Sequence, residues 1–172
     1  MKTPMLLFAT ERYEELGEEV AGAGDFDAGS IERKVFPDGE RYRRIETDCQ
    51  LRDVVLIGGT IDDSDMLEIY DLACGLVHLG VHTLTLVLPW FGYQTMERAS
   101  KPGEIVAAKN RARLLSSLPS AGSGNRAVLM DLHSEGIPHY FEGNIRPVHL
   151  HATSVVLQAI RDFGGEDFVL GA

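Results

Sequence analysis

The chain has 172 residues, 44% of them hydrophobic and 24% charged, which is enough for one globular domain with a hydrophobic core. Its net charge of −10 argues against a nucleic-acid-binding protein, because that function needs a basic face to displace counterions. No apolar run approaches the roughly 20 residues of a membrane-spanning helix, and the apolar start is too short for a secretory signal. The cysteines lack C-x-x-C spacing, so a reducing cytoplasm fits better than a disulfide scaffold.

Strand-like and helix-like segments alternate from the N-terminus. Residues 4–9 form a short apolar run, typical of a buried strand, and Thr10 is placed to cap a helix that ends at residues 22–24. Residues 31–36 and 41–47 predict two strands joined by a P-D-G turn. The first part of the chain therefore predicts a strand, a helix and a β-hairpin.

The middle of the chain has the pattern of a parallel sheet. Residues 54–57 are continuously apolar and lead into G-G-T, as in a central parallel strand. Residues 62–65 (D-D-S-D) can cap a helix, and apolar residues then recur at helical spacing until Gly80. Residues 83–88 predict another buried strand, and residues 104–118 predict a third helix.

The last third continues this alternation. Residues 127–130 and 145–150 predict strands, residues 153–163 a helix, and residues 168–170 a final strand. Strands that alternate with helices favour an open α/β sheet covered by helices on both faces. Such folds place ligands at the carboxyl edge of the sheet, so a chain that stops directly after a strand pattern is expected to be cut from a longer protein.

Two segments are weak candidates for nucleotide binding. Neither GxxxxGK[ST] nor GxGxxG after a strand occurs, and residues 58–60 (G-G-T) lead into an acidic helix start that would repel phosphate. A tight turn is therefore the favoured interpretation there. Residues 36–40 (F-P-D-G-E) place an aromatic ring beside two carboxylates, which can stack on a base and accept hydrogen bonds from its amine. Taken alone, that segment is more simply a hairpin turn.

Two strand ends carry aromatic or titratable side chains. Residues 89–93 (P-W-F-G-Y) can line a pocket or simply pack, and packing is favoured. Asp131 and His133 follow a buried strand on the same face, where the carboxylate can orient the imidazole for a metal or a phosphate. His149 and His151 also share one face of a strand, but no third ligand is apparent and a metal site is not expected there.

Basic residues gather in two short stretches, residues 33–44 and 109–113. Two solvated faces are the favoured interpretation. The alternative is that these side chains contact phosphates or acidic neighbouring subunits.

Together the motifs resemble the ribose-phosphate pyrophosphokinase family. Its N-terminal half carries F-x-D-G-E, P-[YF]-[FL]-G-Y, an E-P-I-x-A-K helix, and D-L-H followed by an aromatic pair. The corresponding segments here are residues 36–40, 89–93, 104–109, 131–133 and 140–141. Order and spacing agree over most of residues 31–157, and four weak motifs in order make a strong signal.

The resemblance implies a fold of phosphoribosyltransferase-like type, a three-layer, open, mostly parallel α/β sheet with a short antiparallel hairpin. It makes residues 1–172 the N-terminal domain of a two-domain synthetase whose C-terminal domain is absent from this chain. The whole protein would transfer pyrophosphate from ATP to ribose 5-phosphate with Mg²⁺, in the cytoplasm, as a homo-oligomer without nucleic-acid or membrane partners. This chain alone would hold no catalytic residue and would be inactive.

The resemblance also assigns site residues. The implied ATP-binding residues are Phe36, Asp38, Gly39, Glu40 and Arg98. Phe36 and the two carboxylates would contact the adenine of an ATP held mainly by a neighbouring subunit. His133 would ligate Mg²⁺ near the ATP phosphates, and Asp131 would support it.

One departure from the family pattern keeps a second hypothesis open. Where the family has A-R-Q-D-R-K, residues 94–99 are Q-T-M-E-R-A, so Thr95 and Met96 replace an arginine and a glutamine that would contact ATP. This favours the alternative of a noncatalytic regulatory or scaffold homologue. A generic dinucleotide-binding α/β domain is the third hypothesis, and the missing glycine fingerprint disfavours it.

Overall fold

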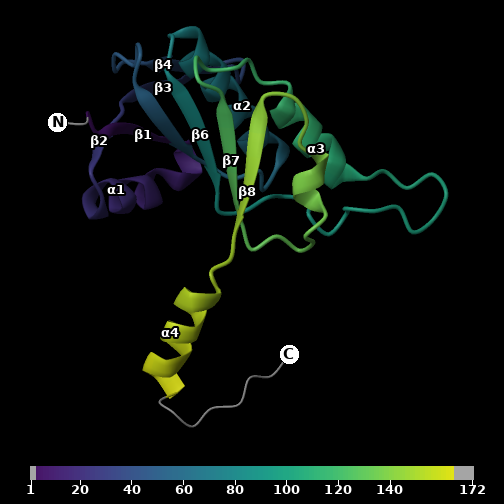
Figure 1. Cartoon of the computed structure of the whole chain (residues 1–172). Coiled ribbons are helices and arrows are strands. Elements are labelled where there is room, and N and C mark those ends of the chain that lie inside the picture. The colour runs from purple at the N-terminus through teal and green to yellow at the C-terminus, as the bar shows by residue number, and fades with distance from the viewer. Residues whose placement is uncertain (1–2, 165–172) are drawn as a thin grey trace.

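The computed structural model of the chain describes residues 3–164. Its large sheet contains β1 (Met5–Ala9), β2 (Phe26–Ala28), β5 (Asp53–Ile57), β6 (Thr83–Leu88), β7 (Asn125–Met130) and β8 (Ile145–Leu150). The strand order is β2-β1-β5-β6-β7-β8, and each neighbouring pair is parallel (Figure 1). A separate antiparallel hairpin is formed by β3 (Ile31–Val35) and β4 (Arg41–Ile45). The expected mostly parallel α/β sheet with an antiparallel hairpin is therefore confirmed.

The helices lie close to their expected positions. The α-helices are α1 (Glu14–Ala23), α2 (Asp63–His78), α3 (Ala107–Ser116) and α4 (Thr153–Gly164), and two short 3-10 turns are η1 (Glu11–Tyr13) and η2 (Ile137–Tyr140). None of the helices within residues 3–164 is long and apolar enough to cross a membrane. The strand expected at residues 168–170 lies outside the described residues.

Two helix starts differ from the sequence expectation. Thr10 makes no side-chain cap, because η1 precedes α1 and the Thr10 side chain is buried. The third helix begins at Ala107 rather than at Glu104. Glu104 Oε2 accepts hydrogen bonds from the amides of Ser100 and Lys101 at 2.6 and 3.0 Å, so this residue closes a loop instead of opening a helix.

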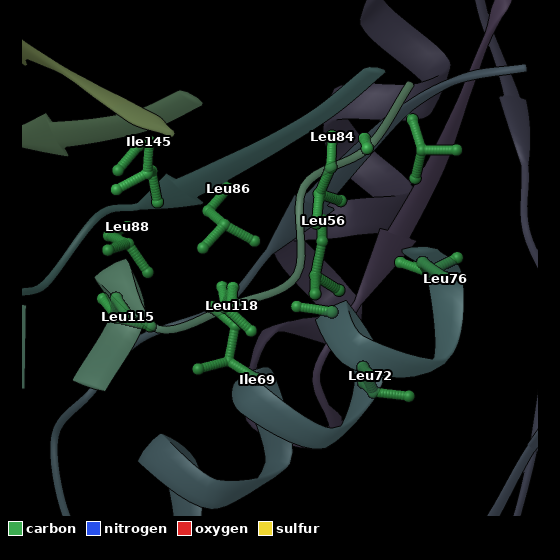
Figure 2. Close-up of a cluster of buried hydrophobic side chains, with 14 of the residues drawn as sticks. Leu56, Ile69, Leu72, Leu76, Leu84, Leu86, Leu88, Leu115, Leu118 and Ile145 are labelled. Atoms are coloured by element: carbon green, nitrogen blue, oxygen red, sulfur yellow. The ribbon is translucent and has the colours of Figure 1, made fainter. Parts of the chain in front are cut away.

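The main core lies between one face of the sheet and the helices α2 and α3. Figure 2 shows Leu56, Leu84 and Leu86 of the central strands facing Ile69 of α2 and Leu115 of α3. All five side chains are fully buried, and burying each stabilises the fold by about 1.5–3 kcal/mol. This core fixes the central strands, and with them the loops at their carboxyl ends.

The opposite face of the sheet is only half covered. Helix α1 packs on Leu7, Val55 and Ile57, at the β1–β5 end of the sheet. Val148 and Leu150 of β8 are 41% and 48% exposed, and no helix within residues 3–164 covers them. The amphipathic α4 buries none of its residues and extends away from the sheet (Figure 1). The expectation of helices on both faces therefore holds for β1 and β5 but not for this face of β7 and β8.

Candidate functional site

All carboxyl ends of the parallel strands meet at one edge of the sheet. The connections from β1 and β5 leave in opposite directions, so the point between these strands is the usual place for a ligand. Here it is filled. A Cβ on Gly58 would lie 2.8 Å from Thr10 Cγ2, and one on Gly59 would lie 2.4 Å from the Tyr13 hydroxyl, whose pKa is raised by burial. The G-G-T segment is a tight turn packed against side chains, as expected.

Asp131 and His133 lie at the carboxyl end of β7, but they are not part of the strand, whose alternation was expected to place both on one face. β7 ends at Met130, and Asp131 has a φ of 41°, so the alternation argument does not apply. Asp131 Oδ1 accepts the Ala152 amide at 3.0 Å, so the carboxylate tethers the chain that leaves β8. His133 is exposed, and its imidazole makes no hydrogen bond within residues 3–164. The imidazole is therefore available to a ligand, without a hydrogen bond from Asp131.

The backbone of this loop is held by two side chains that the sequence did not link to it. The Leu132 N–H donates to His149 Nε2 at 3.0 Å, and the His133 N–H donates to Gln94 Oε1 at 2.8 Å. Gln94 comes from the loop after β6 and His149 from β8. Such contacts between loops distant in sequence leave no signal in residue spacing.

The structure places a third potential metal ligand, Glu135, beside the two histidines of β8. The sequence spacing did not indicate this neighbour. Ligand atoms of Glu135, His149 and His151 lie within 4.8 Å of one another, a spacing that a metal ion can span. However, His149 Nε2 accepts the Leu132 amide, so the ring proton sits on Nδ1 and is donated to Glu135 Oε2 at 3.1 Å. A metal on Nδ1 would displace that proton and break the Leu132 bond. The hydrogen-bonding pattern therefore favours a clamp over a metal site.

The turn between β3 and β4 presents the candidate adenine-binding residues to solvent. Phe36 is 45% exposed, with its edge toward the Tyr42 ring at 6.1 Å. Gly39 has a φ of 91°, which favours glycine, and Asp38 Oδ1 accepts the Glu40 amide at 3.1 Å. No hydrogen bond or ion pair within residues 3–164 joins this turn to the loop of residues 131–133. The exposed ring meets the requirement for stacking, and the adenine role stays a prediction.

The basic side chains of the hairpin are paired inside the chain. Arg33 Nε and Arg43 Nε lie 3.4 and 3.5 Å from Glu68 Oε1, and Glu68 is 3% exposed. The Glu68 carboxylate also accepts the Glu11 amide at 3.1 Å. Arg44 pairs with Glu32 at 2.8 Å. Arg33 and Arg43 thus anchor the hairpin to α2. The alternative that the basic stretch contacts phosphates or an acidic neighbouring subunit stays a prediction.

The loop after β6 divides its aromatic side chains between core and surface. Phe91 is fully buried, with its ring 6.1 Å from that of Phe141, whereas Trp90 is 52% exposed. Met96 is 45% exposed, and the Arg98 side chain is 81% exposed and pairs with Glu97 at 3.5 Å. Packing thus accounts for Phe91. The residues that replace the family's ATP-contacting pair lie on the surface.

A serine–histidine–aspartate network lies at the amino-terminal edge of the sheet. His82 Nε2 is 2.7 Å from Ser123 Oγ, and His82 Nδ1 is 2.9 Å from Asp53 Oδ1. The amides of Ser123 and Gly124 already donate to His82 and Ala121 carbonyls. They are therefore unavailable to stabilise an oxyanion, which such catalysis requires. The network fastens the loop before β7 to β6.

These features define a parallel-sheet α/β domain whose candidate site lies at the carboxyl edge of the sheet, with a separate exposed hairpin. Residues 5–118 match the model of a protein family described as the N-terminal domain of ribose phosphate pyrophosphokinase. That match covers more than half of the chain, so the chain belongs to the ribose-phosphate pyrophosphokinase family.

Relatives and a solved structure agree with this assignment. The ribose-phosphate pyrophosphokinase of Gloeobacter violaceus is 32% identical over 167 residues, which is 95% of this chain and 48% of the relative. That of Fusobacterium nucleatum subsp. nucleatum is 27% identical over 168 residues, 95% of this chain and 51% of the relative. The crystal structure of phosphoribosylpyrophosphate synthetase from Mycobacterium smegmatis shares the fold, with a TM-score of 0.80 at 23% identity over 94% of this chain and 52% of that one. The chain spans about half the length of the curated relatives it matches.

Proposed function

We propose that the protein carrying this chain transfers pyrophosphate from ATP to ribose 5-phosphate, giving phosphoribosyl pyrophosphate and AMP. The observation that carries the proposal is the family match over residues 5–118. The exposed turn of residues 36–40 and the exposed His133 at the carboxyl edge of the sheet support it. The cytoplasm, where ATP and sugar phosphates occur together, is the compartment that this reaction implies.

The exposed hairpin is the proposed adenine site. The Phe36 ring stacks on the base, and the carboxylates of Asp38 and Glu40 accept hydrogen bonds from its exocyclic amine. Gly39 supplies the left-handed backbone conformation that the turn needs between the two acidic residues. The exposed guanidinium of Arg98 would lie near the ATP phosphates in this site.

The residues at the end of β7 fit a weakly ligated magnesium ion. Mg²⁺ in phosphoryl-transfer sites is held by one or two protein groups, by substrate phosphates and by water. His133 offers a free imidazole, and Asp131 keeps one carboxylate oxygen that makes no hydrogen bond within residues 3–164. When bound, the ion neutralises charge on the transferring phosphates. His133 would ligate the ion at the strand end, and Asp131 would support it.

We further propose that two copies of the chain build each ATP site. The adenine residues lie in the hairpin and His133 lies at the end of β7, and no hydrogen bond or ion pair joins them within the described part of the chain. A site that needs both groups is completed if the hairpin of one copy approaches the β7 end of another.

One observation favours a second function, that of a noncatalytic regulatory or scaffold homologue. Thr95 and Met96 are exposed and uncharged where the family pattern has an arginine and a glutamine. Neither side chain can replace a charge-assisted contact to a phosphate. A homologue of this kind keeps the fold and the subunit contacts without the reaction.

Turnover by the whole protein separates the two functions. With Mg²⁺, ATP and ribose 5-phosphate, we expect His133→Ala and Phe36→Ala each to lower kcat/KM by at least about tenfold, the usual effect of losing a metal or substrate contact. His139→Ala is the matched control, since His139 is an exposed histidine of η2 outside the site. Equal turnover of all four proteins would remove both residues from the site, and no turnover in any would favour the noncatalytic homologue.

A further inference from the structure

Two consecutive backbone amides at the end of β7 are held by side chains from other elements. The Leu132 N–H donates to His149 Nε2 at 3.0 Å, and the His133 N–H donates to Gln94 Oε1 at 2.8 Å. Both acceptors are shielded from solvent, because Gln94 is 8% exposed and the His149 side chain 9% exposed. Water cannot reach an amide N–H in such surroundings, so an amide that loses its acceptor is left without any hydrogen bond, which costs free energy. The backbone that leads into the His133 Cα is therefore restrained at two consecutive amides.

The acceptors are themselves held in place. His149 is bonded at both ring nitrogens, since Nε2 accepts from Leu132 and Nδ1 donates to Glu135 Oε2 at 3.1 Å. This fixes the tautomer and the ring orientation, as carboxylates do for histidines that surround metal sites. The loop is tethered a third time by the Asp131 carboxylate on the Ala152 amide at 3.0 Å. The His133 imidazole itself makes no hydrogen bond within residues 3–164.

We propose that Gln94 and His149 are positioning residues, which hold the amides of Leu132 and His133 and thereby direct the His133 imidazole toward the cation. This inference rests on the proposed function, in which His133 ligates Mg²⁺. A metal-binding side chain needs neighbouring residues that hold it in the binding geometry, and Gln94 and His149 do that for His133.

The test uses Mn²⁺ in place of Mg²⁺, in the presence of ATP, on the chain of residues 1–172. Line broadening of the His133 imidazole protons in NMR spectra reports the approach of Mn²⁺, and amide hydrogen exchange at Leu132 and His133 reports the restraint. Gln94→Met and His149→Leu remove the acceptors. Gln94→Glu keeps an oxygen acceptor, and His149→Gln puts an amide oxygen near the place of the imidazole Nε2. His139→Ala is the control for loss of an exposed side chain.

The two acceptor-free variants should weaken the Mn²⁺ effect on His133, and speed exchange of their own partner amide, by about fivefold each, the change that one net hydrogen bond supports. The two acceptor-keeping variants should restore both values. A variant that fails to fold is recognised by far-UV circular dichroism, and the comparison then rests on the pair of variants at the other acceptor. Normal Mn²⁺ broadening in all variants would overturn the positioning role alone. No broadening of His133 in the unsubstituted chain would overturn its metal role in the proposed function, and the positioning role with it.

Discussion

At the scale of single residues, Glu68 is the side chain on which the hairpin depends most. Its buried carboxylate faces Arg33 and Arg43 and also accepts a backbone amide. Removing one member of a buried charged group leaves the others uncompensated, so we expect Glu68→Gln to lower the free energy of unfolding by about 3 kcal/mol. Urea denaturation measures this value.

The matched control for Glu68 is an exposed ion pair. Glu142 pairs with Arg113 at 3.3 Å, and both side chains are more than half exposed. Glu142→Gln should therefore change the free energy of unfolding by no more than about 0.5 kcal/mol. If both substitutions cost the same, Glu68 is not the anchor of the hairpin.

At the scale of elements, the start of α2 gives the fold a defined acid sensitivity. Asp62 Oδ1 accepts the Asp65 amide at 3.0 Å, and this bond holds the pKa of Asp62 below its usual range. A lowered folded pKa contributes stability above the unfolded pKa, and that contribution is lost as the pH falls through the folded pKa. We expect Asp62→Asn to match the unsubstituted chain at pH 7, because asparagine caps equally well. Below about pH 4 the unsubstituted chain should lose stability relative to the variant, which urea midpoints across the pH range would show. A constant difference between the two would contradict the assignment.

A second element-scale prediction concerns the contact between the loops after β5 and β6. A Cβ on Gly92 would lie 1.8 Å from the Thr60 carbonyl oxygen, so the two backbones touch. Gly92→Ala should therefore destabilise the fold by about 2–3 kcal/mol through overpacking. Gly22 of α1 has open space at the same point, and Gly22→Ala should stabilise the fold by up to about 1 kcal/mol. Thermal unfolding of both variants checks the pair, and a harmless Gly92→Ala would show that the loops are not in contact.

The same elements show how far the sequence could be interpreted. The bounds expected for β6 and β8 are those observed. In β6 the alternating leucines of T-L-T-L-V-L, ended by Pro89, mark a strand clearly. The three-residue β2 was not expected, since so short an edge strand has no periodicity. Gln94, Glu135 and His149 were not selected as partners of the His133 loop. Their contacts depend on how β8 and the loops after β6 and β7 meet in the folded chain, and no local sequence pattern predicts that arrangement.

At the scale of the whole molecule, the separation of the hairpin from the end of β7 predicts a homo-oligomer. Arg33 and Arg43 of the hairpin pair with Glu68 inside the chain. Apolar exposure remains at the hairpin tip, where Val35 is 71% and Phe36 45% exposed. We expect light scattering of the whole protein to give a multiple of the subunit mass, and Val35→Asp to lower it. A monomer at micromolar concentration would contradict the shared site.

The central claim is that this chain is one half of an enzyme that moves pyrophosphate as a unit. The measurement that tests it most directly is ³¹P NMR of the whole protein and of residues 1–172, each with Mg²⁺, ATP and ribose 5-phosphate. The whole protein should release AMP and phosphoribosyl pyrophosphate in equal amounts. Residues 1–172 should release neither, because lost positioning of the sugar alone can raise the barrier by about 7–11 kcal/mol. Release of ADP instead of AMP, or turnover by residues 1–172 at a rate near that of the whole protein, would contradict the claim.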